Sequence, residues 1–402
     1  MQTMFPRRSH GGSPGIRCLR PGLAGCVPVR QAAGIGGFPL APMGLVVGVL
    51  QTVSTAGRRG ELHAPRSVFD RGHQTKEIPE RMIAPLAKLI DWSALQMAYV
   101  VAPLRHAPKP QWKLEEALEF LNGPDFISAA SDPARIEFDG PRHFKFPTPL
   151  PGKVEENNIF YGRLYRCAER WQERPVIVLL DGYPPIGNHF AFPLLARRFN
   201  RAGFNVAALV APYELQRRPR RSFEWDCLEF ALTMAQNVAE IRALTGWLLD
   251  EGCPSVGLVA VSFGGWPAEL TACSDARIAS VVLIMPAVAF RMFSSPPVVW
   301  RRVRESLQAL RPAQEAIDTT RLNLILSTPV IPKKNILLIK GIHDLFGNPQ
   351  LIEELWQKWE QPEIWRLPHG HISGLFVPGS TGRVLHWLEP RLNGDTVRTL
   401  NK

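Results

Sequence analysis

The stretch that most constrains this chain is an apolar run, Gly257 to Val261, that ends at Ser262 and two glycines, Gly264 and Gly265. An unbroken row of small and β-branched apolar residues suits a strand that is buried on both faces. The small residues after Ser262 suit a turn too tight for large side chains. We therefore expect a central strand, a sharp turn with Ser262 at its tip, and a helix that begins near Gly265.

Such a strand, turn and helix form the setting of a nucleophile elbow, whose usual motif is G-x-S-x-G. Here Ala260, the next smallest residue, replaces the first glycine, so the motif reads A-x-S-x-G. In an elbow the serine hydroxyl is exposed, and the next backbone N–H can stabilise an oxyanion. A glycine-rich turn that merely closes a core strand fits the same residues, so the motif alone does not decide the role of Ser262.

The rest of the chain alternates apolar runs with helical patterns, and no internal repeat is visible. Alternation of this kind predicts an α/β fold with a mostly parallel central sheet and helices on both faces. Two short alternating runs, 143–146 and 159–165, indicate antiparallel edge strands. The expected buried strands are 175–180, 204–210, 256–261, 281–285, 335–340 and 364–367, and the expected main helices are 223–250, 351–359 and one through 384–387.

The ends of the chain differ in composition from this α/β region. Residues 1–80 are rich in Gly, Pro, Arg and Ser and lack periodicity, which is typical of disorder. A targeting peptide, a disordered tail and a reading frame over-extended beyond a true start at Met82 all fit, and we favour the last two. We expect a helical extension over 81–140, the α/β domain over 141–392 with a small helical cap at about 287–334, and a tail over 393–402.

Charge and cysteine content exclude several classes of protein. The net charge is +11, but residues 1–60 contain seven arginines and no acid, so the other 342 residues carry only +4. The sequence has no basic stripe with interleaved aromatic residues, the pattern that would predict a nucleic-acid-binding groove. We therefore expect no nucleic-acid partner. The six cysteines have no CxxC pair, so reduced thiols in a cytosolic protein are expected. No apolar stretch reaches the roughly 18 residues of a membrane-spanning helix.

Polar residues follow four of the expected strands, where a doubly wound sheet places its ligands. Ser262, Asp344 and His371 occur in an order that suits a catalytic triad, and Asp181 follows the first buried strand. A serine hydroxyl is a weak nucleophile, so an imidazole must take its proton and a carboxylate must orient that imidazole. His369 is the alternative candidate for the base. If His371 is the base, we expect His369 to have a structural role. A metal site built on these histidines has no recurrent ligand spacing and is disfavoured.

An oxyanion site and a substrate contact complete the prediction. The Phe263 N–H would be one oxyanion donor, and Gly182 or Tyr183 would supply the second. An ionised Asp181 would oppose the oxyanion unless it turns away to cap a helix or to form a salt bridge. The arginine-rich segment with Arg217, Arg218, Arg220 and Arg221 also follows a strand, and it could bind a phosphate or carboxylate or pair with a neighbouring acid. Val298 and Trp300 in the cap could face an acyl chain or simply pack.

These residues resemble the α/β-hydrolase superfamily over about 175–390. Within it, the chain is similar to the family called abhydrolase domain-containing protein eighteen and to its bacterial relatives. The motifs that carry this similarity are Gly187-Asn188-His189-Phe190, Pro212-Tyr213-x-x-x-Arg217-Arg218-Pro219, Val261-Ser262-Phe263-Gly264-Gly265 and Gly370-His371-Ile372-Ser373. The resemblance implies a serine-hydrolase fold whose substrate could be a lipid acyl ester. Ala260 and Asp181 depart from the usual pattern.

The sequence therefore predicts a serine hydrolase that cleaves a carboxylic ester or thioester through an acyl-enzyme and needs no cofactor. Its expected substrate is a small-molecule or lipid acyl compound, which could be anionic. The alternative from another class is a non-catalytic α/β-hydrolase-like binding protein. An acyltransferase or a peptidase would use the same triad, because the acceptor of the acyl group distinguishes these reactions.

Overall fold

The computed structural model describes residues 80–101, 114–123, 125–128, 134–183, 185–219, 227–294 and 311–394. Several expectations lie outside these residues. They concern nearly all of the N-terminal 80 residues, Arg220 and Arg221, Val298 and Trp300 in the expected cap, and the last eight residues. Among the described residues, no helix has the length and hydrophobicity needed to cross a membrane.

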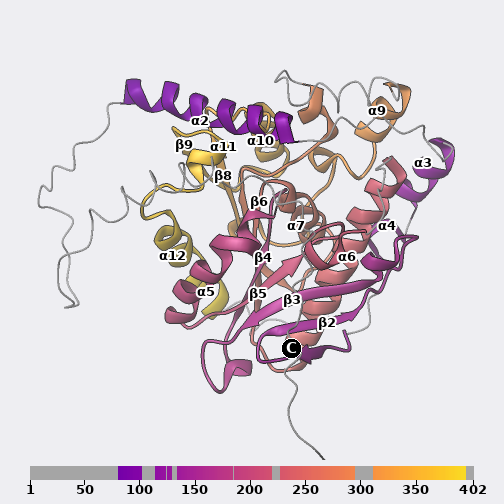
Figure 1. Cartoon of the computed structure of the whole chain (residues 1–402), viewed down its shortest axis with the longest axis vertical. Helices are drawn as coiled ribbons and strands as arrows, with labels where there is room; N and C mark the ends of the chain where they lie inside the picture. Colours follow the sequence, from indigo (N-terminus) through magenta and orange to yellow (C-terminus); the bar gives the residue numbers. More distant parts are fainter. Residues whose placement is uncertain are drawn as a thin grey trace, which may run out of the picture. The chain divides into compact units, whose positions relative to one another are not determined.

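A nine-stranded sheet forms the centre of the described structure, in the order β1-β2-β3-β5-β4-β6-β7-β8-β9 (Figure 1). The first three strands pair antiparallel, and all pairs from β5 to β9 are parallel. This arrangement confirms the predicted α/β class. The strands are β1 Glu137–Asp139, β2 His143–Pro147, β3 Ile159–Tyr165, β4 Val176–Leu180, β5 Asn205–Val210, β6 Val256–Val261, β7 Ile278–Ile284, β8 Ile336–Gly341 and β9 Glu363–Leu367.

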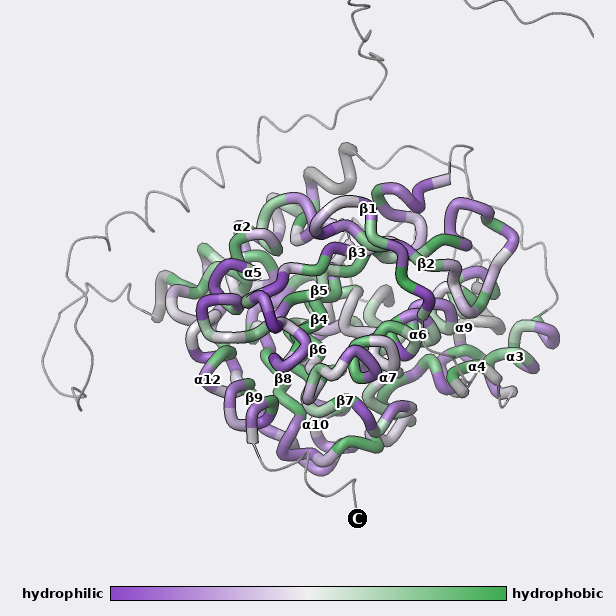
Figure 2. The backbone as a smooth tube through the Cα atoms, turned by 90° about the horizontal axis from the view of Figure 1, so that it is seen from below, coloured by the Kyte–Doolittle hydropathy of each residue, from purple (hydrophilic) through white to green (hydrophobic). Residues whose placement is uncertain are grey.

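Alternate residues of the central strands point to two separate cores. Along β4, Val176, Val178 and Leu180 join one buried cluster, while Ile177 and Leu179 join another. Every residue of β4 is buried, so this strand carries apolar side chains without interruption. The tube coloured by hydropathy is green along the central strands (Figure 2). Unbroken hydrophobicity was therefore a sound indicator of a strand covered on both faces.

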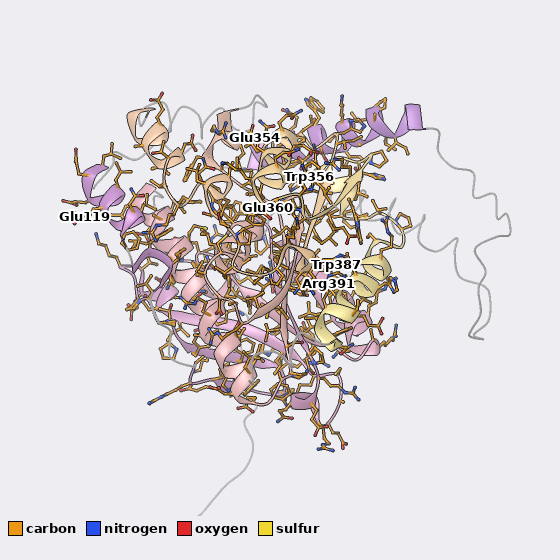
Figure 3. The ribbon with its side chains drawn as sticks, turned by 180° about the vertical axis from the view of Figure 1, so that it is seen from behind. Glu119, Glu354, Trp356, Glu360, Trp387 and Arg391 are labelled. Atoms are coloured by element: carbon orange, nitrogen blue, oxygen red, sulfur yellow. The ribbon has the colours of Figure 1, made fainter. Side chains whose placement is uncertain are left out.

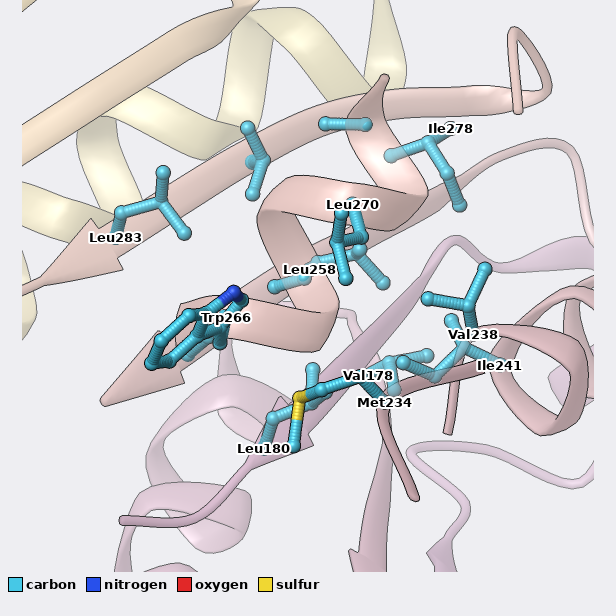
Figure 4. Close-up of a cluster of buried hydrophobic side chains, with 14 of the residues drawn as sticks. Val178, Leu180, Met234, Val238, Ile241, Leu258, Trp266, Leu270, Ile278 and Leu283 are labelled. Carbon is cyan, nitrogen blue, oxygen red and sulfur yellow. The ribbon is translucent and has the colours of Figure 1, made fainter. Parts of the chain in front are cut away.

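Helices cover both faces of the sheet. On one face lie α6 Cys227–Asp250, α7 Gly265–Ala272 and α10 Pro349–Lys358. Figure 4 shows the part of this core in which Trp266 and Leu270 of α7 lie near Leu258 of β6. The opposite face is covered by α5 Phe192–Arg201, preceded by the π-helical turn η3 Gly187–Ala191, and by α12 Ser380–Asn393.

The strand order reverses its direction beside the predicted serine. After β4 the chain crosses through α5 to β5 on one side of it, and then through α6 to β6 on the other side. The carboxyl ends of β4 and β6 therefore meet where the direction of winding reverses, which is where open α/β sheets bind ligands. The segment from Asp181 to Tyr183 and the turn at Ser262 both lie at this edge.

One helix before β1, α2, lies at the same edge of the sheet, because it packs against an element that follows β9. The N-terminal helices are α2 Glu80–Val101, α3 Leu114–Asn122 and α4 Asp125–Ser128. Helix α2 packs against the short helix α11 His371–Gly374 (Figure 1). Ala87, Asp91 and Leu95 are buried at a spacing of four residues, so they form the inward stripe of α2.

One feature differs from the sequence-based expectation. The strands β2 and β3 are antiparallel as predicted, but the edge strand is β1, whose three residues are all exposed. A strand without buried side chains gives no alternating pattern, so the sequence did not indicate it. The cap region contains α9 Arg311–Asp318 and the 3₁₀ turns η6 Phe290–Ser294 and η8 Leu324–Leu326 within its described parts.

Helix α7, which directly follows the serine turn, carries an unusual buried acid. Glu269 is 0% exposed, and neither of its carboxylate oxygens has a hydrogen-bond partner among the described residues. Burial alone raises its pKa well above 4.5. A carboxyl in this environment favours the protonated form, because ionisation would place an unpaired charge in the core.

We expect Glu269→Gln to remove a pH-dependent loss of stability. The unfolded chain releases the Glu269 proton above about pH 4.5 while the folded chain keeps it, so the free energy of unfolding falls as pH rises. The slope is up to about 1.4 kcal/mol per pH unit. Urea unfolding from pH 5 to pH 8 should therefore show a stability difference that grows in favour of Glu269→Gln. The exposed Glu251→Gln should show the same pH dependence of stability as the wild type. If the stability of Glu269→Gln changed with pH in parallel with that of the wild type, the protonated state of buried Glu269 would be contradicted.

Candidate active site

The serine turn has the backbone strain expected of an elbow. Strand β6 ends at Val261, and Ser262 follows with a φ of 52°, a left-handed conformation that is uncommon outside glycine. Such strain persists only where the surrounding structure fixes it, and it concentrates at functional sites. The 3₁₀ turn η5 Ser262–Gly264 then leads directly into α7.

Glycine is required next to this turn because backbones approach closely. A Cβ at Gly264 would lie 2.3 Å from the carbonyl oxygen of Asp181, and a Cβ at Gly265 would lie 2.6 Å from Cβ of Pro286. A Cβ at Gly182 would lie 3.0 Å from Cβ of Ser262. The segment after β4 therefore runs directly against the serine turn, and the glycines permit that contact.

Three of the predicted residues lie in one hydrogen-bonded chain. His371 Nε2 lies 3.0 Å from Ser262 Oγ, and His371 Nδ1 lies 2.7 Å from Asp344 Oδ2. The residues come from the loops after β6, β8 and β9, so the carboxyl edge of the sheet brings them together as expected. His371 and Asp344 are both buried, which strengthens their electrostatic interaction.

The carboxylate and the imidazole of this chain are each held by further contacts. Oδ1 of Asp344 accepts hydrogen bonds from the N–H groups of Phe346 and Gly347, at 2.7 and 2.8 Å. The Phe346 ring stacks on the His371 ring, with centroids 4.9 Å apart. Asp344 thus keeps Oδ2 for the imidazole, and the ring plane of His371 is fixed from one side.

The charge state of His371 follows from two opposing effects. Burial lowers the pKa of the imidazole, but the charge and hydrogen bond of Asp344, with a smaller contribution from Asp91, raise it above its usual 6.5. When Nδ1–H donates to Asp344, Nε2 is left as an acceptor for the serine hydroxyl. The environment thus stabilises the imidazolium that would form when Nε2 takes a proton.

Asp181 is turned away from the serine and caps a backbone turn. Its carboxylate accepts hydrogen bonds from the N–H groups of Gly182, Gly187 and Asn188, at 2.9, 3.1 and 2.6 Å. Burial raises the pKa of Asp181 to about 6, against the lowering effect of these donors. The Asp181 carboxylate therefore caps η3. Capping is one of the two arrangements that would keep the carboxylate from opposing an oxyanion.

The contacts of Asp181 distinguish Gly182 from Tyr183, the two candidates for the second oxyanion donor. The Gly182 N–H is directed at Asp181, whereas the Tyr183 N–H has no hydrogen-bond acceptor among the described residues. The Tyr183 side chain is 74% exposed, so this segment borders solvent. Phe263, whose N–H follows the serine, packs its ring edge-on against Phe230 of α6, with centroids 5.8 Å apart.

A known protein family matches part of the chain. The model of the family described as "Alpha/beta hydrolase domain containing 18" matches residues 129–297, which include the strands from β1 to β7 and the serine turn. Over these residues the chain is similar to this α/β-hydrolase family, as the motifs had indicated.

Two curated relatives of the chain come from Mycobacterium tuberculosis. They are "Uncharacterized protein MT2702" of strain CDC 1551 / Oshkosh and "Uncharacterized protein Rv2627c" of strain ATCC 25618 / H37Rv. Each is 28% identical over 156 residues, which is 38% of this chain and 36% of the relative. The match therefore spans about a third of the length of either relative.

Solved structures of other α/β proteins show distant likeness. The Pyrococcus furiosus esterase Pf2001 is 15% identical with a TM-score of 0.44, and the match covers 73% of this chain and 100% of the esterase. A puromycin-hydrolyzing peptidase from Mycobacterium tuberculosis is 13% identical with a TM-score of 0.46, over 65% of this chain and 40% of the peptidase. The assignment of the fold rests on the strand order and the serine turn, not on these scores.

The expectation that Arg217 binds a substrate anion needs correction. Its side chain is 0% exposed and forms a two-pronged ion pair with Glu240 of α6, at 2.8 and 2.7 Å. It also donates to the backbone carbonyls of Val210 and Asn157. A guanidinium enclosed in this way has no surface for a ligand, so Arg217 is the structural pair that was the alternative. Arg218 is exposed.

We expect Arg217→Ala to lower the free energy of unfolding by about 3–5 kcal/mol, because it leaves the Glu240 carboxylate buried without its partner. Arg218→Ala, one residue away and exposed, should change it by less than about 0.5 kcal/mol. Urea unfolding monitored by circular dichroism compares the two variants. If the two variants were equally stable, the Arg217–Glu240 pair would contribute no net stability, and the structural role of Arg217 would be contradicted.

One polar residue at the site was missed by sequence reasoning. Asp91 of α2 is 0% exposed and accepts hydrogen bonds from backbone N–H groups next to both Asp344 and His371. The sequence did hold a signal, because Asp91 falls on the apolar stripe with Ala87 and Leu95, where a charge needs buried partners. That signal indicates a partner but not its identity.

Among the described residues, His343 and His369 do not join the chain of hydrogen bonds from Ser262. The carbonyl oxygen of His369 accepts from the His343 N–H at 3.1 Å, so these residues connect the loops after β8 and β9 through their backbones. Burial and the neighbouring His343 lower the pKa of His369. Among the described residues, no cluster of His, Cys, Asp and Glu side chains is arranged to hold a metal ion.

A cavity of about 550 Å³ lies away from the serine, between β9 and α12. Its lining includes Trp365, Arg383, Trp387 and Arg391, and none of the three hydrogen-bonded residues borders it. Figure 3 shows Trp387 and Arg391 together on α12, where the guanidinium lies 3.8 Å from the ring centroid. We place the candidate active site at Ser262 because the chemically capable groups converge there.

Proposed function

We propose that this α/β hydrolase is a serine hydrolase that cleaves a carboxylic ester or thioester through an acyl-enzyme. The observation that carries the proposal is the continuous chain from Ser262 Oγ through His371 to Asp344, with contacts of 3.0 and 2.7 Å. These are the three groups that activate a serine nucleophile; they lie within hydrogen-bonding distance, and His371 and Asp344 are buried.

Each group has a defined role in the proposed reaction. Ser262 Oγ attacks the acyl carbon while His371 Nε2 takes its proton, and Asp344 stabilises the resulting imidazolium. The leaving alkoxide or thiolate receives that proton as the tetrahedral intermediate collapses to the acyl-enzyme. Water then attacks the acyl carbon while His371 takes its proton, and His371 gives that proton to Ser262 Oγ as the second tetrahedral intermediate collapses and releases the carboxylic acid.

The oxyanion would be stabilised by two backbone N–H groups. One belongs to Phe263, which directly follows the nucleophile, and the other to Tyr183, because the Gly182 N–H is taken by Asp181. The contact of Gly182 with Ser262 brings the Tyr183 segment to the same place. Backbone donors held by such packing lose little energy to reorganisation during the reaction.

An acyl chain is the part of the substrate for which the site offers apolar surface. Leu375 and Phe376 directly follow α11, and both are exposed. They lie within five residues of His371 in the sequence, and we propose that they contact the apolar part of the acyl group. Esters with an apolar acyl group, including lipid acyl esters, are therefore the first substrates to screen.

We expect a fluorophosphonate to add once to the full-length protein, at Ser262. Ser262→Ala should abolish the adduct, and His371→Ala should slow its formation by at least about a hundredfold, because a general base contributes that much or more. His369→Ala is the matched control and should label at nearly the wild-type rate. Intact-mass spectrometry measures all four proteins. A well-folded wild type without an adduct would contradict the proposal.

The pH dependence of labelling tests the role of the imidazole. Neutral His371 is the active base, so the rate should fall with decreasing pH through a pKa above 6.5, the direction set by Asp344. Asp344→Asn removes that charge, so the acidic limb should move to lower pH, and the maximal rate should fall because the tautomer is no longer fixed. An unchanged limb in Asp344→Asn would mean that another group controls the rate.

A further inference from the structure

Asp91 of α2 contacts the backbone of the two loops that carry the proposed base and its acid. Its Oδ2 accepts hydrogen bonds from the N–H groups of His371 and Leu345, at 2.6 and 3.1 Å. Its Oδ1 accepts from the Ile372 N–H at 2.9 Å. One carboxylate thus binds the base residue itself and the residue directly after Asp344.

The two loops come from different strands, so the contact ties them together. Asp344 lies after β8 and His371 lies after β9, and their side chains must stay within hydrogen-bonding distance for the chain to Ser262 to form. Helix α2 lies against α11, which begins at His371 (Figure 1). The carboxylate therefore acts where a small slip of either loop would separate base from acid.

Gly370 shows how closely the carboxylate approaches. A Cβ at this position would lie 2.5 Å from Asp91 Oδ2 and 2.6 Å from its Cγ. The φ of Gly370 is −85°, which any residue can adopt, so backbone conformation does not demand a glycine here. The small residue before His371 instead makes room for the Asp91 carboxylate.

A purely structural helix contact would not need a carboxylate. Ala87 and Leu95 flank Asp91 on the buried stripe of α2 and pack through apolar atoms alone. Burying an acid costs free energy that an apolar residue of similar size would not. Three backbone donors offset that cost, and all three belong to residues in or next to the proposed triad.

We propose that Asp91 is a positioning residue that fixes the loops after β8 and β9 relative to each other, so that His371 stays aligned between Asp344 and Ser262. The inference rests on the proposed function, because it assigns Asp91 a role in that same reaction. Asp91 does not touch the reacting atoms. It acts through the backbone of His371 and of the residue after Asp344.

The charges around His371 make the role of Asp91 distinguishable from simple packing. Asp344 on the loop after β8 and Asp91 on α2 are the two carboxylates whose charges act on the imidazole, while His343 and His369 interact with each other. Asp91→Asn keeps the size and one acceptor oxygen but loses the charge. It should therefore shift the acidic limb of the rate to lower pH, which loss of packing would not do.

The test measures the rate constant for fluorophosphonate labelling of Ser262 in the full chain. Asp91→Ala should slow labelling by about tenfold to a hundredfold, the cost of misplacing a catalytic group by roughly 1 Å. Asp91→Asn should slow it less and move the acidic limb. Leu95→Ala is the matched control, because it weakens the packing of α2 without touching the carboxylate, and it should label within about threefold of the wild type once folded.

A double-mutant cycle with Gly370 isolates the contact itself. Gly370→Ala should slow labelling in the wild-type background, where its Cβ would displace the carboxylate, and should cost several-fold less in Asp91→Ala, where nothing is displaced. If Asp91→Ala does not fold, Asp91→Asn and Gly370→Ala still provide the pH shift and the rate loss.

The outcomes separate this inference from the proposed function. A wild type that labels while Asp91→Asn, Asp91→Ala and Gly370→Ala keep its rate and pH profile would overturn the positioning role and leave the serine hydrolase intact. Equal losses in Asp91→Ala and Leu95→Ala, with no shift of the acidic limb in Asp91→Asn, would also overturn it. A folded wild type that does not label would remove the proposed function, and this inference with it.

Discussion

The rest of the site depends on one contact between backbones, that of the serine turn with the segment after β4. The carbonyl of Asp181 occupies the space that a side chain at Gly264 would fill. This approach holds Ser262 in its left-handed conformation and sets the Tyr183 segment beside it. It is possible because β4 and β6 are neighbours in register, with Leu180 opposite Ala260. The parallel pairing of β4 with β6 thus determines where the Ser262 hydroxyl lies.

Buried polar groups around this contact keep the loops in place, and each has a specific partner. Asp181 caps the turn at Gly187 and Asn188, and Arg217 joins the end of β5 to Glu240 of α6. Glu214 is an exception, since burial and the nearby Asp181 raise its pKa to about 9, which leaves it protonated at neutral pH. The buried polar groups around the serine turn therefore carry fewer charges at neutral pH than their number of acidic residues suggests.

Much of the fold could be predicted because its information is local. Unbroken apolar runs predicted the central strands, and the segments after three of the strands contain Ser262, Asp344 and His371. In the fold, His371 lies within hydrogen-bonding distance of the other two. The roles of Arg217 and Asp91 could not be read in this way, because both depend on contacts across the chain. Position after a strand suggested that Arg217 faced a ligand, but its distance from Glu240 in space decides its role. Asp91 lies 280 residues from His371 in sequence, and only the folded sheet brings them together.

That separation has a consequence for how the protein becomes active as it is made. A ribosome completes α2 early, the serine turn much later, and the base loop 109 residues after the serine. Until His371 and Ile372 emerge, the Asp91 carboxylate lacks two of its three donors, and α2 has no α11 to pack against. The central strands can pair before Ser262 has its proposed base. Under the proposed function, a nascent chain would carry a serine that is not activated, and activity would arise in one late step when the loop after β9 meets α2.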